Sequence, residues 1–345
     1  MLRKKVPQRI TRVLILHSIL LCVLLPVVTS AAPLVIAHRG ASGYVPEHTL
    51  AAGAMAYAMV ADYLELDVVL TKDRVPVVFH DLYLDAMTDV ASQFSGRARA
   101  DGKHYVADFT LAELGKLSLN ERISLKTGKV RYPKRFKAAT GLFRIPTLEQ
   151  VLELTRGLNH SGEREMGVYV EIKAPAWHEK QNLDIVGRVL DTMHALGYSK
   201  ASDKAFIQCF DAGTLQRISA QGLTQLRLIQ LIGENRWWPE AKTDYDYLRT
   251  TAGLREISSY AVGIGPWLGQ IITDRDEDGI PTYSTLVRDA HASGLLVHPF
   301  TLRADKLPAG VREFDQLLNE LFNELKVDGA FTDHPDLVRR FIGLD

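Results

Sequence analysis

The sequence predicts an α/β protein, a TIM (β/α)8 barrel with an insertion subdomain over its active-site mouth. Eight short apolar segments have the composition of buried strands, and a stretch of helical length follows each of them. Polar residues stand where several of these strands end, which is the edge at which such barrels carry their active sites. A long polar segment, about residues 82–144, interrupts the alternation, and we expect it to form the insertion.

The predicted strands begin near residues 34, 63, 167, 205, 226, 261, 295 and 329. Predicted helices cover residues 50–60, 147–156, 180–196, 246–259, 282–293, 311–325 and 335–342, and one more begins at Asp211. Residues 75–79 form an extended run of a different kind, because Pro76 cannot donate a hydrogen bond inside a sheet. We expect this run to return beside the second strand as a hairpin arm.

Residues 1–32 have the organisation of a secretory signal peptide. Five Lys and Arg residues come first, an apolar run over 13–28 follows, and small residues occupy 29–32. The alternative is an uncleaved membrane anchor, but an apolar run of about 16 residues is short for a membrane span. We therefore expect cleavage, export, and no stable membrane insertion of the remaining domain, residues 33–345.

The net charge and the cysteine content of the chain bear on its partners and on the source of its stability. Removing the five basic residues of the leader from the 41 Lys and Arg leaves 36 against 41 Asp and Glu, a formal charge of −5. This negative balance argues against nucleic acid as a partner. Cys209 is the one cysteine outside the leader, so no intrachain disulfide can form and stability must come from a large core.

His38 and Arg39 come directly after the first apolar strand, residues 34–37. In α/β folds, ligands bind at this end of the strands. A histidine beside an arginine suits an anionic substrate to which a proton must be transferred. His80 ends the hairpin arm in a similar way, next to Asp81, and would complete an acid and base pair.

Three carboxylates stand near the ends of the second and third predicted strands. Glu65 and Asp67 are two residues apart, so their side chains share one face of a strand, and Glu171 and Lys173 do the same. Buried acids are costly without a compensating cation. Three carboxylates make an oxygen site suited to Ca²⁺ or Mg²⁺ and poor for zinc. The alternative is an edge strand with solvated acids, which the neighbouring apolar residues disfavour.

These groups together describe one chemistry. A divalent cation held by the three carboxylates, with Arg39 and Lys173 beside it, favours a phosphate ligand. Two histidines that titrate near neutral pH add proton transfer. The residues therefore predict metal-assisted hydrolysis of a phosphoester.

Four segments resemble the glycerophosphodiester phosphodiesterase family: HRGASGYVPEHT (38–49), ELDVVLTKD (65–73), VFHD (78–81) and EIKAP (171–175). The likeness covers essentially all of residues 33–345. It implies hydrolysis of a small glycerophosphodiester to sn-glycerol 3-phosphate and an alcohol such as choline, ethanolamine or glycerol, in the periplasm. It also implies residue roles: His38 and His80 as the acid–base pair, Glu65, Asp67 and Glu171 as calcium ligands, Arg39 and Lys173 on the phosphate, and Glu47 orienting the site.

Two features leave alternatives open. Residues 274–279 match the start of an EF-hand loop, but Thr285 stands where a glutamate ligand is expected, so a second Ca²⁺ site and a solvated acidic loop are both considered. His298, at the end of the seventh strand, either lines the substrate pocket or makes a hydrogen bond at the barrel mouth. His48 is expected to be structural.

Two other functions fit the same residues. A lysophospholipase D or a sphingomyelinase-D-like enzyme would use the same head group, but would need an apolar channel for an acyl chain. A surface binding protein would keep the fold and hold a partner with the insertion, although the intact set of histidines and charged residues argues against lost catalysis. The oligomeric state, the preferred head group and the nucleophile, water or a glycerol hydroxyl, are left open.

Overall fold

The computed structural model describes residue 2 and residues 32–136, 141–237 and 242–343. The chain divides into two units, residues 1–31 and 32–345, and the fold described below is that of the second. The predicted signal peptide, residues 1–32, falls almost entirely outside the described residues. Among the helices that the structure describes, none has the length and apolar character needed to cross a membrane.

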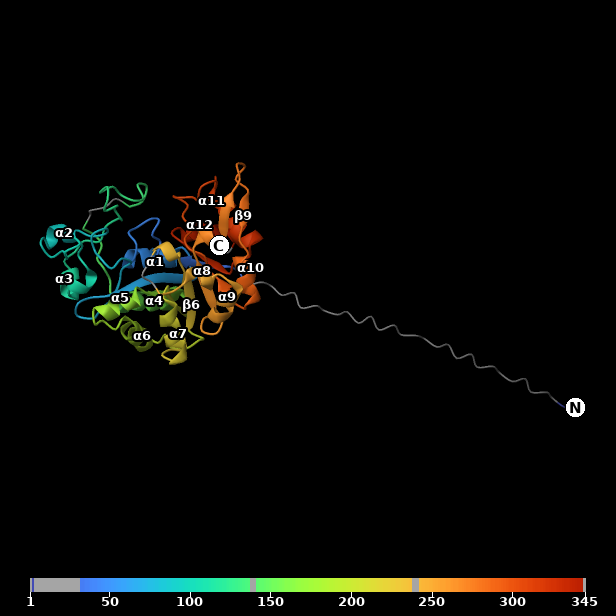
Figure 1. Ribbon diagram of the computed structural model, residues 1–345, viewed down its shortest axis with the longest axis horizontal. Coiled ribbons are helices and arrows are strands. Elements are labelled where there is room, and N and C mark those ends of the chain that lie inside the picture. Colours follow the sequence, from blue (N-terminus) through green and yellow to red (C-terminus); the bar gives the residue numbers. More distant parts are fainter. Residues whose placement is uncertain (1, 3–31, 137–140, 238–241, 344–345) are drawn as a thin grey trace. The chain divides into compact units, whose positions relative to one another are not determined.

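Eight parallel strands form a barrel enclosed by helices (Figure 1). Backbone hydrogen bonds join the two ends of the strand ladder, since Asp328 N donates to Val297 O (3.1 Å) and Phe331 N to Pro299 O (3.0 Å). The predicted TIM barrel is confirmed. In ladder order its strands are β10 (Leu296–Val297), β7 (Gly263–Pro266), β6 (Arg227–Ile232), β5 (Ala205–Cys209), β4 (Gly167–Ile172), β2 (Tyr63–Leu70), β1 (Leu34–Ala37) and β11 (Gly329–Thr332).

Several helices begin where a side-chain cap satisfies free backbone N–H groups. Thr49 Oγ1 accepts from Ala52 N, and Thr147 Oγ1 accepts from Gln150 N in a reciprocal capping box. The helices between strands are α1 (Leu50–Ala58), α4 (Leu148–Gly162), α5 (Pro175–Lys180), α6 (Ile185–Ala195), α7 (Ala212–Ala220), η2 (Asn235–Trp237), α8 (Tyr245–Leu248), α9 (Thr251–Ile257), η3 (Leu268–Gln270), α10 (Leu286–Ala292), α11 (Phe314–Leu318), the π-helix η4 (Asn319–Glu324) and α12 (Pro335–Phe341).

Several predicted helices were wrong in extent; the helix predicted over 147–156, for example, continues to residue 162. Residues 180–196 contain parts of two helices, because Asp184 accepts a hydrogen bond from Gly187 N and starts α6 separately from α5. Residues 246–259 also contain parts of two, because the Thr250 side chain caps α9 after α8 has ended. The helix predicted over 282–293 is shorter, since residues 281–283 form a strand, β9, and α10 begins at residue 286.

The interior of the barrel is filled by a layer of large apolar side chains. Tyr169 and Phe206 are fully buried there, with ring centroids 4.8 Å apart. Tyr63 and Tyr169 precede Glu65 and Glu171 by two residues on the same strands, so the aromatic layer lies directly beneath the acids. The whole layer comprises Ile36, Tyr63, Tyr169, Phe206, Ile229 and Phe331. This packing gives the acidic end of the barrel a dry and rigid floor.

The insertion follows a hairpin in which β3 (Pro76–Val78) pairs antiparallel with β2, so the predicted hairpin arm is present. Its regular elements are short: α2 (Val90–Gln93), η1 (Val106–Asp108) and α3 (Leu111–Leu114). The insertion has a hydrophobic core of its own, in which Met87, Phe109 and Leu114 pack with Val77 and Phe79 of the hairpin. Figure 1 shows α2 and α3 to one side of the barrel.

A second hairpin, β8 (Ile272–Arg275) and β9 (Pro281–Tyr283), was not predicted. The acidic loop 274–279 leads into its turn. Asp276 Oδ1 accepts hydrogen bonds from the backbone N of Asp278 (3.1 Å) and of Ile280 (2.8 Å), so this carboxylate stabilises the turn. Within the described ranges, the acids of this loop do not form a group close enough to hold a metal ion.

The barrel floor generates a prediction about stability. Phe206→Ala should lower the free energy of unfolding by about 3–5 kcal/mol, because it opens a cavity under fully buried rings. Leu223→Ala, at a side chain 39% exposed, is the matched surface control and should change it by less than about 0.5 kcal/mol. Urea unfolding followed by circular dichroism measures both. Equal effects of the two substitutions would contradict the packed-floor description.

Candidate active site

One cavity of about 920 Å³ opens at the carboxyl end of the barrel strands. Seven residues singled out from the sequence line it: His38, Arg39, Glu65, Asp67, His80, Glu171 and Lys173. Gln208 of β5 lines the same cavity. The rest of its wall is mixed. Charged side chains such as Arg131, Asp276 and Lys306 stand beside apolar and aromatic ones, which include Tyr132, Phe210, Leu231, Trp237, Trp267, Leu268, Phe300 and Leu307. The structure thus brings residues from the first strand, the second and third barrel strands and the hairpin arm to one place.

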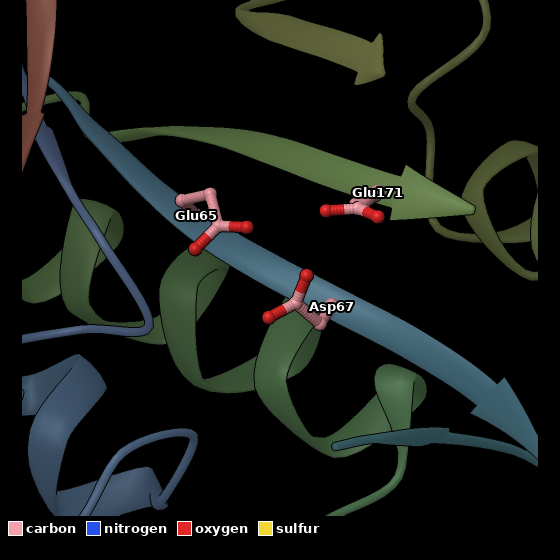
Figure 2. Close-up of side chains that lie close together, drawn as sticks. All are labelled: Glu65, Asp67 and Glu171. Atoms are coloured by element: carbon pink, nitrogen blue, oxygen red, sulfur yellow. The ribbon is translucent and has the colours of Figure 1, made fainter. Parts of the chain in front are cut away.

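Three buried carboxylates gather in this cavity (Figure 2). Glu65 and Asp67 come from β2 and Glu171 from β4, and the register of the two strands pairs Asp67 with Glu171. One oxygen from each carboxylate lies within 4.8 Å of the others. Glu65 Oε2 accepts from the backbone N of Arg39 (2.8 Å), and Glu65 Oε1 from Gln208 Nε2 (3.1 Å).

The electrostatics of these acids fit a bound cation. Burial, and then the charge of Asp67, raise the pKa of Glu65 well above its ordinary value. Burial also raises the pKa of Glu171 to about 8. Burial opposes ionisation of Asp67, but Lys173, His80 and Arg39 hold its pKa well below the ordinary value. Two of the three acids are therefore disposed to be neutral in the ion-free protein, and a divalent cation would favour all three in ionised form.

Two basic side chains flank the acids. Lys173 Nζ lies 2.9 Å from Glu171 Oε1 and 3.4 Å from Asp67 Oδ1. Arg39 Nη1 donates to Glu47 Oε1 (2.8 Å), and its Nε lies 3.2 Å from Asp67 Oδ2. Arg39 has a left-handed backbone (φ 58°), and at the next residue, Gly40, an added Cβ would approach Ala52 within 2.7 Å. The tight turn after β1 requires this glycine, and the turn carries the guanidinium into the cavity.

Each cavity histidine is bonded to a carboxylate through Nδ1. His38 Nδ1 lies 2.6 Å from Asp333 Oδ1, and His80 Nδ1 lies 2.5 Å from Asp81 Oδ1. Burial and the charge of Arg39 lower the pKa of His38 to about 4 and that of His80 to about 3. Both rings are therefore neutral at pH 7 when no anion is present. With Nδ1 engaged, Nε2 of each ring is the nitrogen left for proton transfer.

Several residues of the site were not identified from the sequence as part of it. Asp333 follows the last barrel strand, and its pairing with His38 joins residues far apart in the chain. His48 was expected to be structural, and its buried Nε2 lies 2.8 Å from Asp67 Oδ2, where it orients a predicted metal ligand. Asp81 was read only as a neighbour of His80. A strand-end position for Asp333 and a HisAsp dipeptide for Asp81 are the signals that could have found them.

His298, for which a place in the substrate pocket and a hydrogen bond at the barrel mouth were both considered, does not line the cavity. Its side chain is fully buried inside the barrel, and Nδ1 lies 3.1 Å from the hydroxyl of Tyr169. Its ring also lies against Phe206, with centroids 6.0 Å apart. Of the two alternatives, the structure shows the hydrogen bond, which His298 makes with a buried tyrosine of the barrel interior. Glu47 is buried behind Arg39, where it orients the guanidinium.

The comparison with known protein families identifies the chain. The model of the glycerophosphoryl diester phosphodiesterase family matches residues 38–337. The chain belongs to this family of enzymes. Glycerophosphodiester phosphodiesterase of Haemophilus influenzae is 38% identical over 325 residues, which cover 90% of this chain and 89% of that protein. The relative of Treponema pallidum with the same name is 34% identical and covers 90% of this chain and 92% of its own length.

Solved structures of the family share the fold. One from Silicibacter pomeroyi DSS-3 superposes with a TM-score of 0.68 at 26% identity, over 90% of this chain and 93% of the other. An Oleispira antarctica phosphodiesterase, solved in complex with its product sn-glycerol-3-phosphate, has a TM-score of 0.60 at 21% identity, over 90% of this chain and 97% of the other. The family resemblance noted in the sequence is confirmed.

The raised pKa values of the acids lead to a prediction about metal binding. A divalent cation bound by the three acids would have to displace a proton from Glu171, whose pKa of about 8 leaves it mostly protonated at pH 7. Affinity for Ca²⁺ should therefore rise as the pH rises from 6 towards 8, and binding at pH 7 should release protons. Calorimetry in buffers of different ionisation enthalpy measures the release. Glu171→Gln should bind more weakly and release fewer protons, and a pH-independent affinity would contradict the interpretation.

Proposed function

We propose that the protein hydrolyses glycerophosphodiesters to sn-glycerol 3-phosphate and an alcohol, using a divalent cation and the two cavity histidines. One observation carries this proposal: in a chain of this family, two histidine–carboxylate pairs and a buried cluster of three carboxylates open into the same cavity. The names of the relatives from Haemophilus influenzae and Treponema pallidum support the reaction, and the product bound to the Oleispira antarctica enzyme supports the glycerol phosphate end.

Glu65, Asp67 and Glu171 would hold the cation, which we propose to be Ca²⁺, with Mg²⁺ as the alternative. The cation would stabilise negative charge on the phosphate and orient the substrate. Arg39 and Lys173 neutralise the phosphate from the protein side. An anionic phosphodiester beside them offsets the positive charges that depress the histidine pKa values, so the substrate itself makes protonation of a histidine easier.

His38 acts as the base and His80 as the acid. His38 follows a barrel strand directly and is bonded to Asp333, so its Nε2 takes the proton of the attacking oxygen, from water or from the glycerol hydroxyl of the substrate. His80 stands at the end of the hairpin arm and is bonded to Asp81, so its Nε2 gives a proton to the departing alcohol. An alkoxide such as that of choline is a poor leaving group and needs this proton.

We also propose that residues 1–32 are a cleaved signal peptide and that the enzyme acts in the periplasm. The order of basic, apolar and small residues supports this location. N-terminal sequencing of the protein recovered from osmotic-shock fractions tests it. A chain that retains residues 1–32 and stays in the spheroplast fraction would contradict it.

The apolar and aromatic part of the cavity wall favours a second candidate function, lysophospholipase D activity. Leu231, Leu268 and Leu307, with the aromatic residues of the wall, offer an apolar surface that an acyl chain requires. Turnover of lysophosphatidylcholine beside glycerophosphocholine separates the two functions. We expect glycerophosphocholine, glycerophosphoethanolamine and glycerophosphoglycerol to be used within about tenfold of one another. A clear preference for lysophosphatidylcholine would favour the second candidate.

Removal of the metal is the first prediction from this proposal. EDTA should abolish the hydrolysis of glycerophosphocholine, and added Ca²⁺ should restore it, because three buried carboxylates cannot all stay ionised without a cation. Release of choline, measured with a coupled oxidase assay, reports the activity, and elemental analysis reports the metal. Full activity of a protein shown to be metal-free would overturn the cation's role.

The division of labour between the histidines gives the second prediction. His80→Ala should slow choline release by about 10²–10⁴-fold, the usual contribution of a general acid. The same variant should lose less than about tenfold with glycerophospho-p-nitrophenol, whose leaving group needs little protonation. His38→Ala should lose both activities heavily. The reverse pattern would mean that His38 is the acid and His80 the base. If both variants lost activity equally on both substrates, neither histidine would act as a separate acid.

A further inference from the structure

Two arginines of the insertion stand behind the two histidines. Arg122 Nη1 donates to Asp81 Oδ2 (2.6 Å), while the other oxygen of Asp81 is bonded to His80 Nδ1. Arg135 Nη2 donates to Asp333 Oδ2 (2.6 Å), while the other oxygen of Asp333 is bonded to His38 Nδ1. The same sequence of contacts, arginine to carboxylate to histidine, therefore occurs twice.

These contacts are buried and lie around one space. The side chain of Arg122 is 10% exposed and that of Arg135 is 3% exposed. Both arginines, both carboxylates and both histidines line a second cavity of about 520 Å³ under the insertion, and the two histidines also line the larger cavity. Both histidine pairs thus stand between the larger cavity and guanidinium groups that the insertion supplies.

The arrangement restricts each carboxylate. With one oxygen held by an arginine and the other by an imidazole, the carboxylate has little freedom to rotate. A carboxylate that is fixed in this way keeps the proton on Nδ1 and directs Nε2 to the substrate. The charges act in the same direction, since His80 and Arg122 hold the pKa of Asp81, and Arg303, His38 and Arg135 that of Asp333, well below the ordinary value.

We propose that Arg122 and Arg135 are positioning residues, each of which fixes one histidine through its carboxylate, so that the insertion sets the geometry of both proton transfers. The proposal rests on the proposed function, because it takes His38 as the base and His80 as the acid. The insertion would then contribute to catalysis itself, whether or not it also binds a partner protein.

The two positions differ in how much support remains when the arginine is removed. Asp333 Oδ2 also accepts from Nε of Arg303 (2.8 Å), a residue outside the insertion. Arg122 is the guanidinium bonded to Asp81 in the part of the chain that the structure describes. Removal of Arg122 should therefore disturb the orientation of His80 more than removal of Arg135 disturbs the orientation of His38.

Arg122 has a second contact that the experiment must separate. Its Nη2 donates to Glu47 Oε1 (2.7 Å), and Glu47 in turn accepts from Arg39 of the phosphate site. If the substitution acts by displacing Glu47, and with it Arg39, it should weaken the binding of every substrate to the same degree. A disturbance that travels through Asp81 would lower kcat selectively for substrates with a poor leaving group.

The test compares kcat and KM for glycerophosphocholine and glycerophospho-p-nitrophenol. Arg122→Met should lower kcat for glycerophosphocholine about 10- to 100-fold, the range typical of outer-shell partners, and kcat for the nitrophenyl substrate by less than about threefold. Arg135→Met should lower kcat for both substrates to a similar and smaller degree. KM should change by less than about threefold in both variants. Each arginine variant would then reproduce, in weaker form, the substrate pattern of its own histidine.

Arg99→Met is the matched control. Arg99 also belongs to the insertion and is paired with a carboxylate, Asp108, but it lines neither cavity. It should leave the ratio of the two kcat values unchanged. Arg122→Lys and Arg135→Lys keep the charge but not the planar fork, and should show the same patterns with smaller losses. If a methionine variant fails to fold, as judged by circular dichroism, the lysine variant at that position supplies the measurement.

His38→Ala and His80→Ala are assayed in the same series. If the histidine variants show the predicted division of labour while Arg122→Met affects both substrates equally, or raises KM alone, the positioning role is wrong and the proposed function stands. If the histidine variants retain full activity, the proposed acid–base function fails first. A control variant that changes the kcat ratio as much as Arg122→Met would also overturn the positioning role.

Discussion

The pairing of β2 with β4 is the constraint on which the mouth of the barrel depends. Its register sets Asp67 beside Glu171, and Glu65 lies two residues earlier on the same face of β2. Carboxylates this close and this deeply buried repel one another and favour their neutral forms. The positive charges of Arg39 and Lys173, in contact with these acids, offset this repulsion and stabilise the ionised forms. Glu47 pairs with Arg39 and keeps its guanidinium in place. The positions of the charged side chains in the cavity are therefore set mainly by ion pairing.

The aromatic floor and the insertion complete this organisation from opposite sides. Tyr169 and Phe206 fill the barrel beneath the acids and keep the strands at a fixed spacing, which holds the carboxylate oxygens at a spacing that suits an ion. The insertion contributes no predicted ligand and neither histidine. Its arginines nevertheless reach the carboxylates of both histidine pairs, so a segment that interrupts the barrel repeat is bound into the site by buried ion pairs.

Local patterns in the sequence were sufficient to predict the barrel and the histidines, acids and basic residues that meet in the cavity. Residues two apart on a strand share a face, and polar residues at strand ends gather at one rim, so Glu65, Asp67 and Lys173 could be placed without knowledge of tertiary contacts. Contacts between distant segments could not be placed this way. The Asp333 and Arg135 contacts depend on how the strands close and how the insertion folds. The two alternatives for His298 could not be separated, because the sequence does not fix how deep in the barrel a strand residue lies.

In the mechanism proposed above, with His38 as the base, its pairing with Asp333 makes the reaction depend on the completion of the fold. These residues follow the first and the last barrel strands and are separated by 295 positions in the chain. Their hydrogen bond can form only after β11 has docked beside β1, which is a contact of high sequence separation and therefore of slow formation. A chain that has built every other strand still has a histidine without its carboxylate. Hydrolytic competence thus appears with barrel closure, and catalytic activity reports that the last strand is in place.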